Sequence, residues 1–225
     1  EVLNKRQPPY SPEDIGLLSA LSNLASVAIV NTRLIQDQKN FFSHVLELLV
    51  GMIEISRPRM VEHPTRAARL ACAITRALGG DEFEYRMMYY AGLLHDIGYV
   101  GFKNPKVLAE MGILSPVEEQ HPMMSVKMLE GIRMLDGAIP IIKHHHERWD
   151  GQGFPAKLKE EAIPVGARIL ALVEVIEDLR MNAGVPPEEL RSRAVAEIKS
   201  GRGTRFWPEA VDVAVELIET QDGFL

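Results

Sequence analysis

The chain has 225 residues, of which 46% are hydrophobic and 25% are charged, so it can bury a substantial core and is neither disordered nor fibrous. Its formal charge of -6 gives no general attraction to phosphate backbones, which argues against nucleic acid as a partner. The single cysteine, Cys72, cannot form an internal disulfide, and no apolar run approaches the roughly 20 residues that span a bilayer. We therefore expect a reducing, cytoplasmic setting without a membrane partner.

The N-terminal segment predicts the end of a strand followed by a helix. The chain begins at Glu1 without a methionine or a basic-then-apolar leader, and we expect a fragment of a longer protein. Val2 and Leu3 precede a polar, proline-containing stretch that is typical of a strand running into a turn. Ser11 is a good N-cap and Pro12 suits the first helical position, so a helix is predicted to begin there.

Apolar residues at helical spacing extend this helix to about Asp37, and the pattern can continue to Ile55. The stripe consists of Leu17, Leu18, Leu21, Leu24, Ala25, Ala28, Ile29, Leu34 and Ile35. A pattern of this length predicts a connecting helix that packs along a partner. We expect a homodimer through this helix, and packing onto the body of the same chain is the alternative.

Helical patterning dominates from Phe41 onward, and few stretches alternate with period two. Glycine and proline interrupt the pattern at intervals, and Ser115-Pro116 repeats the cap-then-proline start of a helix. The sequence therefore predicts an all-α fold, with an appended segment over residues 1–40 and a helical domain over residues 41–225.

The histidines carry the strongest chemical signal. Of seven, His44 is isolated, and the others are His63, His95, His121, His144, His145 and His146. A lone histidine is more often a hydrogen-bonded structural residue, but a cluster favours metal ligation. The run from His144 to His146 could be an accident of composition, although it leads into a loop rich in turn residues. Imidazole and carboxylate ligands suit iron, manganese or zinc far better than calcium.

The doublet His95-Asp96 follows the apolar run Ala91 to Leu94, which predicts that it lies at the end of a buried helix. Adjacent helical residues point about 100° apart, so both side chains reach one metal only if the ion lies close to the backbone. An aspartate in this position can also bridge two ions.

Together with other residues, the histidines form a series of short motifs over about residues 41–218. They are His63 with Arg66, His95-Asp96-Ile97-Gly98, His121-Pro122, the segment from His145 to Pro155, Ile163-Pro164, Ala167-Arg168-Ile169, and Gly203-Thr204-Arg205-Phe206. In these motifs the chain resembles the HD superfamily of metal-dependent phosphohydrolases, and within it the HD-GYP group of bacterial cyclic di-GMP phosphodiesterases. The resemblance implies an HD-type antiparallel helical bundle with a long N-terminal connecting helix. Residues 1–40 resemble the last strand and terminal helix of a GAF sensor domain.

The resemblance also implies a site for two transition-metal ions, iron or manganese rather than zinc. Its metal ligands would be His63, His95, Asp96 and Glu174 for one ion and His121, His145 and His146 for the other, with Asp96 bridging. Glu174 aligns with the family's late aspartate, and the alternative is an ordinary acid on a helix surface. His95 and Asp96 are the residues expected to be catalytic.

The chain departs from the family mostly at residues expected to bind substrate. Tyr99 stands where the family usually has a lysine, and Phe154 replaces the tyrosine of the Gly-Tyr-Pro signature. The basic segment expected after the late aspartate is absent. Arg180 and Lys103, with Lys106, are the cations expected to compensate for it.

Two functional interpretations remain open, from different classes. In the first, a dinuclear centre activates hydroxide to hydrolyse cyclic di-GMP or a related phosphodiester. In the second, the domain is a degenerate HD-GYP signalling module that binds metal and nucleotide without efficient hydrolysis. Retention of every histidine ligand favours the enzyme, because apolar residues would stabilise a core without the cost of burying polar groups. A purely structural interaction module would rest on the N-terminal helix alone.

Overall fold

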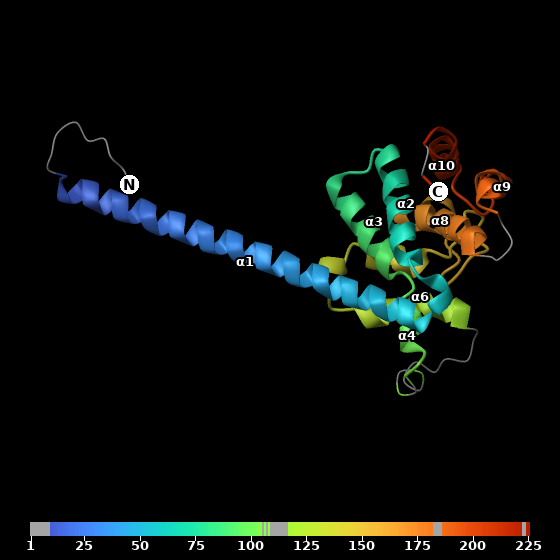
Figure 1. Cartoon of the computed structure of the whole chain (residues 1–225), viewed down its shortest axis with the longest axis horizontal. Helices are drawn as coiled ribbons and strands as arrows, with labels where there is room; N and C mark the ends of the chain where they lie inside the picture. Colours follow the sequence, from blue (N-terminus) through green and yellow to red (C-terminus); the bar gives the residue numbers. More distant parts are fainter. Residues whose placement is uncertain (1–9, 105, 107, 109–116, 182–185, 222–223) are drawn as a thin grey trace. The chain divides into compact units, whose positions relative to one another are not determined.

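A computed structural model of the chain describes residues 10–104, 106, 108, 117–181, 186–221 and 224–225 (Figure 1). Among these residues every regular element is a helix, apart from one isolated bridge between Arg202 and Phe206, so the all-α prediction is confirmed. The predicted strand at Val2-Leu3 and the predicted helix start at Ser115-Pro116 lie outside the described residues. The chain divides into two compact units, Glu1–Glu47 and Leu48–Leu225, seven residues beyond the boundary expected from the sequence.

Helix α1 (Pro12–Ser56) begins in the first unit and ends in the second. Ser11 caps it as predicted, because its hydroxyl accepts a hydrogen bond from the Asp14 N–H at 3.2 Å and its own N–H donates to the Asp14 carboxylate at 2.8 Å. The apolar side chains of its first half are exposed, with Leu17 at 63% and Leu24 at 68%.

The expectation that no segment is apolar enough for a membrane span needs correction at α1. An 18-residue window of this helix has a mean hydropathy of 1.5 and no buried residues, which meets the requirement by length and composition alone. Serine and asparagine residues interrupt the apolar run without adding charge, so the average stays high. One such helix near the start of a chain is weak support for a membrane location.

The second unit contains the end of α1 and the other helices that the structure describes. These are α2 (His63–Ala77), α3 (Glu82–Leu94), α4 (Gly98–Gly101), α6 (Val117–Leu129), α7 (Ile139–His144), α8 (Val165–Met181), α9 (Pro187–Ser200) and α10 (Pro208–Thr220). Single 3-10 turns occupy Pro58–Met60, Arg133–Leu135 and Glu160–Ala162. Helix α2 packs against both α3 and α8 (Figure 1). Leu70, Ile74 and Leu94 are fully buried in this core, and each contributes about 1.5–3 kcal/mol of burial free energy.

A glycine allows α2 and α3 to approach closely. A Cβ atom added at Gly92 would lie 2.5 Å from the Cα of Ala68, so no larger residue fits between the two backbones. The helices run in opposite directions, with His63 at the start of α2 and His95 directly after the end of α3. Their tight packing therefore brings the two histidines together at one end of the bundle.

A second glycine brings α6 to the same place. A Cβ atom added at Gly98 would lie 2.2 Å from the carbonyl oxygen of His121. The Gly98 N–H donates to the Ser125 hydroxyl at 2.9 Å, and that hydroxyl donates to the carbonyl of His95 at 2.6 Å. The turn after α3 is thereby joined to α6, which sets His121 beside Asp96.

Candidate metal centre

Three helices contribute the first group of potential ligands, which are His63, His95 and Glu174. The Nε2 atoms of His63 and His95 lie 3.2 Å apart. Oε1 of Glu174 lies 2.9 Å from Nε2 of His95 and 3.5 Å from Nε2 of His63. Both histidines are fully buried, and the Glu174 side chain is 12% exposed. The group thus joins α2, the end of α3 and the middle of α8.

The donor atoms of this group fit a bound cation. Oε1 of Glu174 is buried and has no conventional hydrogen-bond partner, although two imidazole nitrogens lie within 3.5 Å of it. Buried polar atoms are nearly always paired, so an orphaned oxygen that faces two imidazole nitrogens indicates ligands that converge on an ion. Two histidines and one carboxylate are a common ligand set for transition metals.

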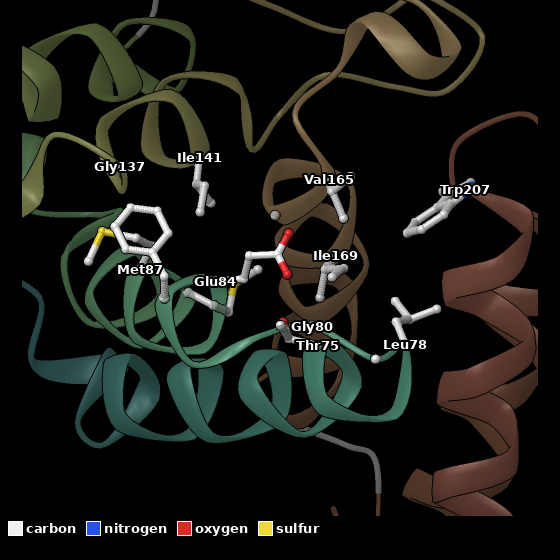
Figure 2. Close-up of a pocket in the computed structure, with 14 residues that line it drawn as sticks. Thr75, Leu78, Gly80, Glu84, Met87, Gly137, Ile141, Val165, Ile169 and Trp207 are labelled. Atoms are coloured by element: carbon white, nitrogen blue, oxygen red, sulfur yellow. The ribbon is translucent and has the colours of Figure 1, made fainter.

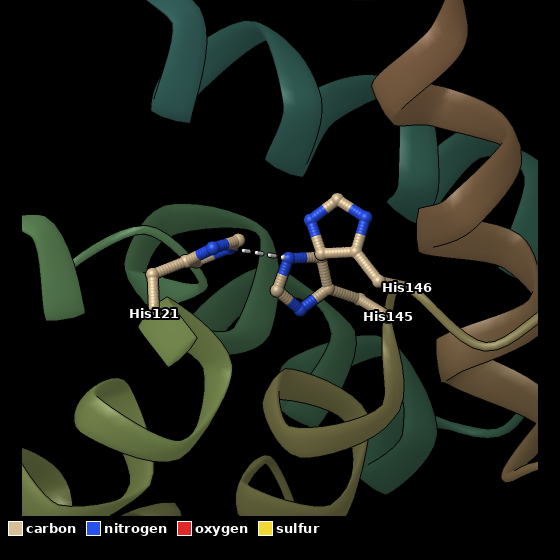
Figure 3. A group of neighbouring side chains, drawn as sticks. All are labelled: His121, His145 and His146. Carbon is tan, nitrogen blue, oxygen red and sulfur yellow. Dashed lines mark hydrogen bonds between the residues drawn. The ribbon is translucent and has the colours of Figure 1, made fainter. Parts of the chain in front are cut away.

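The second group consists of His121, His145 and His146, whose rings face one another (Figure 3). The Nε2 atoms of His121 and His145 are 3.1 Å apart. Asp96 lies between the two groups, because its Oδ1 is 3.6 Å from Nε2 of His95 and 3.3 Å from Nε2 of His121. The structure therefore brings together all seven residues that the sequence nominated as ligands.

Backbone and carboxylate partners orient these imidazoles. Nδ1 of His95 lies 2.9 Å from the carbonyl of Gly92, and Nδ1 of His145 lies 2.6 Å from the carbonyl of Ile142. A proton on Nδ1 donates to these carbonyls and leaves the lone pair of Nε2 directed into the site. On the other side of His63, Oε2 of Glu177 lies 3.6 Å from Nδ1.

The first group is rich in acid, and its histidines are correspondingly basic. Burial alone would lower the pKa of His63, but the nearby carboxylates of Glu174 and Glu177 raise this pKa to about 10. Burial also opposes the charge on His95, yet Glu174 and Asp96 raise its pKa. Burial would raise the pKa of Glu174, but the neighbouring imidazoles of His95 and His63 hold it well below its usual range. The positive charge on protonated His63 and His95 offsets the negative charge of the carboxylates, which a bound metal cation would otherwise offset.

The second group is the electrostatic opposite of the first. Burial lowers the pKa of His145 well below its usual value, and the neighbouring imidazoles of His146 and His121 add to the shift. Burial also lowers the pKa of His146. Both rings are therefore neutral at pH 7, which is the form that coordinates metal.

The residues expected to bind substrate fall into two classes. Two aromatic rings stack on the second group: Phe154 on His146, with centroids 4.8 Å apart, and Tyr99 on His121, at 4.5 Å. Two of the three expected cations have other partners. Lys103 donates to the carbonyl of Ser56 at 3.2 Å, and Arg180 donates to Glu177 at 3.2 Å.

Two residues of the site were not among those expected from the sequence. Nη1 of Arg57 donates to Oδ2 of Asp96 at 3.2 Å, and its guanidinium lies 3.9 Å from the centroid of the Tyr99 ring. Arg57 is 39 positions from Asp96, so no local pattern could have indicated it. Glu177 accepts hydrogen bonds from Arg66 and Arg180 behind His63. Its position three residues after Glu174, on the same helix face, was an available signal.

A cavity of about 190 Å³ opens beside the two groups. Its lining is His145, His146, Glu147, Arg148, Gln152, Gly153, Phe154, Ala171, Glu174, Asp178, Arg205 and Phe206.

A larger cavity of about 500 Å³ lies among α2, α3, α7 and α8, around Glu84 (Figure 2). No histidine lines this cavity. The Glu84 carboxylate caps α3 by accepting a hydrogen bond from the Asp81 N–H at 2.9 Å. Despite its size, the larger cavity brings together no group of candidate metal ligands among the described residues, and the Glu84 carboxylate in its lining is engaged in the helix cap.

Residues 47–210, which include all seven nominated ligands, match the HD domain. The chain belongs to the HD-domain family. HD proteins of this superfamily are metal-dependent phosphohydrolases, which agrees with the two donor groups. The GAF resemblance of residues 1–40 stays a prediction.

Relatives of this HD-domain chain are bacterial phosphodiesterases. A cyclic di-GMP phosphodiesterase of Thermotoga maritima is 29% identical over 187 residues, which are 80% of the chain and 50% of the relative. The cyclic di-GMP phosphodiesterase response regulator RpfG of Xanthomonas campestris is 33% identical over 153 residues, or 65% of the chain and 40% of the relative. The chain thus spans half or less of the length of these relatives.

Solved structures support the HD fold. A cyclic GMP-AMP specific phosphodiesterase of Vibrio cholerae has a TM-score of 0.63 at 21% identity, covering 79% of this chain and 49% of that one. The HD domain of the Listeria monocytogenes phosphodiesterase PgpH, solved with cyclic-di-AMP, has a TM-score of 0.52 at 17% identity, covering 76% and 95%. At these identities the likeness establishes the HD-type helical fold alone.

Proposed function

We propose that this HD-domain chain is a metal-dependent phosphodiesterase that hydrolyses cyclic di-GMP or a related phosphodiester. The observation that carries the proposal is the position of Asp96 between the two donor groups, with Oδ1 at 3.6 Å from His95 and 3.3 Å from His121. A carboxylate held between two sets of imidazoles suits a pair of ions a few ångströms apart. Relatives named as cyclic di-GMP phosphodiesterases support this substrate class.

We propose iron or manganese rather than zinc for the two ions, as the HD-GYP resemblance implies, and a donor set of carboxylates and imidazoles accommodates either metal. Such ions, when bound, supply an activated water and offset the charge that develops on a phosphoryl group. The chain's own residues prepare the site. His145 and His146 are held neutral by burial, Asp96 joins the groups, and the Phe154 ring offers a surface on which a base can stack.

A degenerate signalling module is the second candidate, and the contacts of the substituted residues favour it. The Tyr99 ring covers His121 where a flexible lysine would reach toward substrate, and Arg180 is bonded to Glu177. A site that retains its metal ligands but has lost cations for phosphate would bind metal and hydrolyse slowly.

A hydrolysis assay on the full, metal-loaded chain distinguishes these candidates. Under anaerobic, iron-replete conditions, cyclic di-GMP and the activated diester bis-p-nitrophenyl phosphate would be offered in parallel. The enzyme proposal predicts cleavage of both, lost in His95→Ala and kept in His44→Ala, whose exposed ring bonds to Asn40 on α1. Cleavage of neither substrate by metal-loaded protein would favour the signalling module.

We also propose that the chain forms a homodimer through α1. Residues at alternating intervals of four and three form a continuous stripe: Leu17, Leu21, Leu24, Ala28, Asn31, Ile35, Gln38, Phe42 and Val45. This is the spacing of a coiled-coil seam, in which a polar residue such as Asn31 sets register. A membrane span would need no such seam, so the stripe favours a second copy of the chain over a bilayer.

A further inference from the structure

The cavity beside the metal groups contains two arginines, and they differ in how far they are already neutralised. Arg148 forms two hydrogen bonds to Asp150, from Nε at 3.0 Å and from Nη2 at 2.6 Å. Arg205 has one ion-pair partner among the described residues, Glu197, with Nη1 3.7 Å from Oε1 and both side chains about half exposed. An exposed contact at this distance holds a guanidinium weakly. Arg205 is therefore the cation in this cavity that is available to an anion.

The backbone of Arg205 is held against the loop that carries His146. Its carbonyl accepts a hydrogen bond from the Trp149 N–H at 3.2 Å, and the Thr204 carbonyl accepts one from the Asp150 N–H at 2.8 Å. The next residue, Phe206, is 1% exposed and anchors the turn in the core. A flexible side chain thus extends from a fixed point on the cavity wall.

None of the carboxylates that line the cavity forms an ion pair with this guanidinium in the described part of the chain. Glu147 accepts hydrogen bonds from the N–H groups of Ala156 and Leu158 at 2.7 and 3.0 Å. Glu174 faces the histidines of the first group. Asp178 shares the cavity with Arg205 but forms no ion pair with it within 4.0 Å in the described part of the chain. No acid in this wall therefore competes closely for Arg205.

We propose that Arg205 binds a phosphate oxygen of the substrate and supplies the positive charge that Tyr99 does not. This inference rests on the proposed function, because it places a phosphodiester in the cavity beside His146 and Glu174. A guanidinium offers paired N–H donors that match two oxygens of one phosphate, which a phenol cannot do. The ligand class is a phosphodiester or, more simply, an inorganic phosphate anion.

Two arginines of one turn provide a matched test. Arg202 lies three residues before Arg205, forms two hydrogen bonds to Asp212 at 2.8 and 2.7 Å, and is absent from the cavity lining. Arg205→Gln and Arg202→Gln remove the same charge from the same turn. Binding of inorganic phosphate and of cyclic di-GMP to the full, metal-loaded variants would be measured by calorimetry, with metal content determined for each.

We expect Arg205→Gln to weaken binding of both anions by about ten- to a hundred-fold, Arg205→Lys to recover part of it, and Arg202→Gln to bind like the wild type. Equal affinity in Arg205→Gln and Arg202→Gln overturns the proposal. A loss of metal in Arg205→Gln also overturns it, because the residue then has a structural role. So does a metal-loaded wild type that binds neither anion.

The phosphate measurement separates this inference from the proposed function. If the wild type binds phosphate but hydrolyses no diester, the enzyme assignment fails, and the comparison of Arg205→Gln with Arg202→Gln still decides the role of Arg205. If the wild type hydrolyses cyclic di-GMP and both variants keep its KM, the enzyme assignment stands and the role of Arg205 is refuted.

Discussion

The ring of Tyr99 stacks on the imidazole of His121, with 4.5 Å between centroids and 16° between planes. The guanidinium of Arg57 lies over the same tyrosine ring while it donates to Asp96. From sequence alone, Tyr99→Lys looks like a restoration of a lost charge. In the structure it would remove a ring that orients a metal ligand and would place one cation beside another. We therefore predict a positioning role for Tyr99, exerted through His121.

Replacement of Tyr99 tests this role. We expect Tyr99→Leu to lower the affinity of the second group for metal by about ten-fold, because partners that orient a ligand typically contribute ten- to a hundred-fold. Tyr99→Phe keeps the stacked ring and should bind metal within a few-fold of the wild type. Competition with a chelator of known affinity provides the measurement. Equal loss in both variants would instead point to the hydroxyl group.

The two donor groups should lose metal separately. We expect about two transition-metal ions per wild-type chain, about one in Glu174→Gln, and almost none in Asp96→Ala, because Asp96 lies between the groups. His44→Ala is the control, since His44 lies on α1 and its ring bonds to the Asn40 carbonyl. Elemental analysis of protein purified without chelator gives the count. If Glu174→Gln kept its full metal content, Glu174 would be an ordinary acid of the helix and not a metal ligand.

Gly98 should tolerate no side chain. Its Cβ would lie 2.2 Å from the His121 carbonyl and 2.8 Å from the Ser125 N and Oγ atoms, so we expect Gly98→Ala to lower the free energy of unfolding by about 1–3 kcal/mol. Gly51 in α1 has nothing within 4 Å of its Cβ position, and Gly51→Ala should raise stability by about 0.5–1 kcal/mol. Urea unfolding curves measure both. A neutral Gly98→Ala would mean that α6 can move away without cost.

The Arg148–Asp150 pair predicts a pH-dependent contribution to stability. Hydrogen bonding to Arg148 lowers the pKa of Asp150 in the folded chain. The carboxylate therefore stabilises the fold above the unfolded-state pKa of about 3.9, and this contribution is lost as the pH falls through the folded-state value. Solvent screens the pair, because the Arg148 side chain is 37% exposed. Asp150→Asn should cost about 0.5 kcal/mol at pH 7, and this cost should shrink as the pH falls through the folded-state pKa, measured by chemical unfolding across the acid range.

Self-association through α1 should depend on the apolar stripe from Leu17 to Val45 and not on the total charge of the helix. Leu21→Glu with Leu24→Glu places two carboxylates on the seam, and we expect light scattering to show a halved mass per particle. Ser19→Glu with Ser26→Glu adds the same charges away from the seam and should leave the mass unchanged. A chain lacking residues 1–36 should match the first pair. A monomeric wild type refutes the dimer, and sedimentation with lipid vesicles would then test the membrane alternative.

Much of the site could be predicted because its signals are local. A doublet such as His95-Asp96 and a run such as His145-His146 indicate a candidate metal site without any knowledge of partners, and helical periodicity predicted the all-α fold. Capping by Ser11 was predictable for the same reason, since its partner Asp14 lies three residues away.

The substrate-facing cations could not be predicted, because their role depends on which residues neutralise them. Arg180 and Lys103 looked available in the sequence, but they bond to Glu177 and to the carbonyl of Ser56. In the sequence Arg205 stood only as part of the motif from Gly203 to Phe206, with no expected role in binding substrate, yet backbone hydrogen bonds hold it on the cavity wall. Residue types and short spacings in the sequence were thus enough to nominate the candidate ligands that the fold brings together. Only tertiary packing, which brings together charges far apart along the chain, decides which cations remain available to a phosphate.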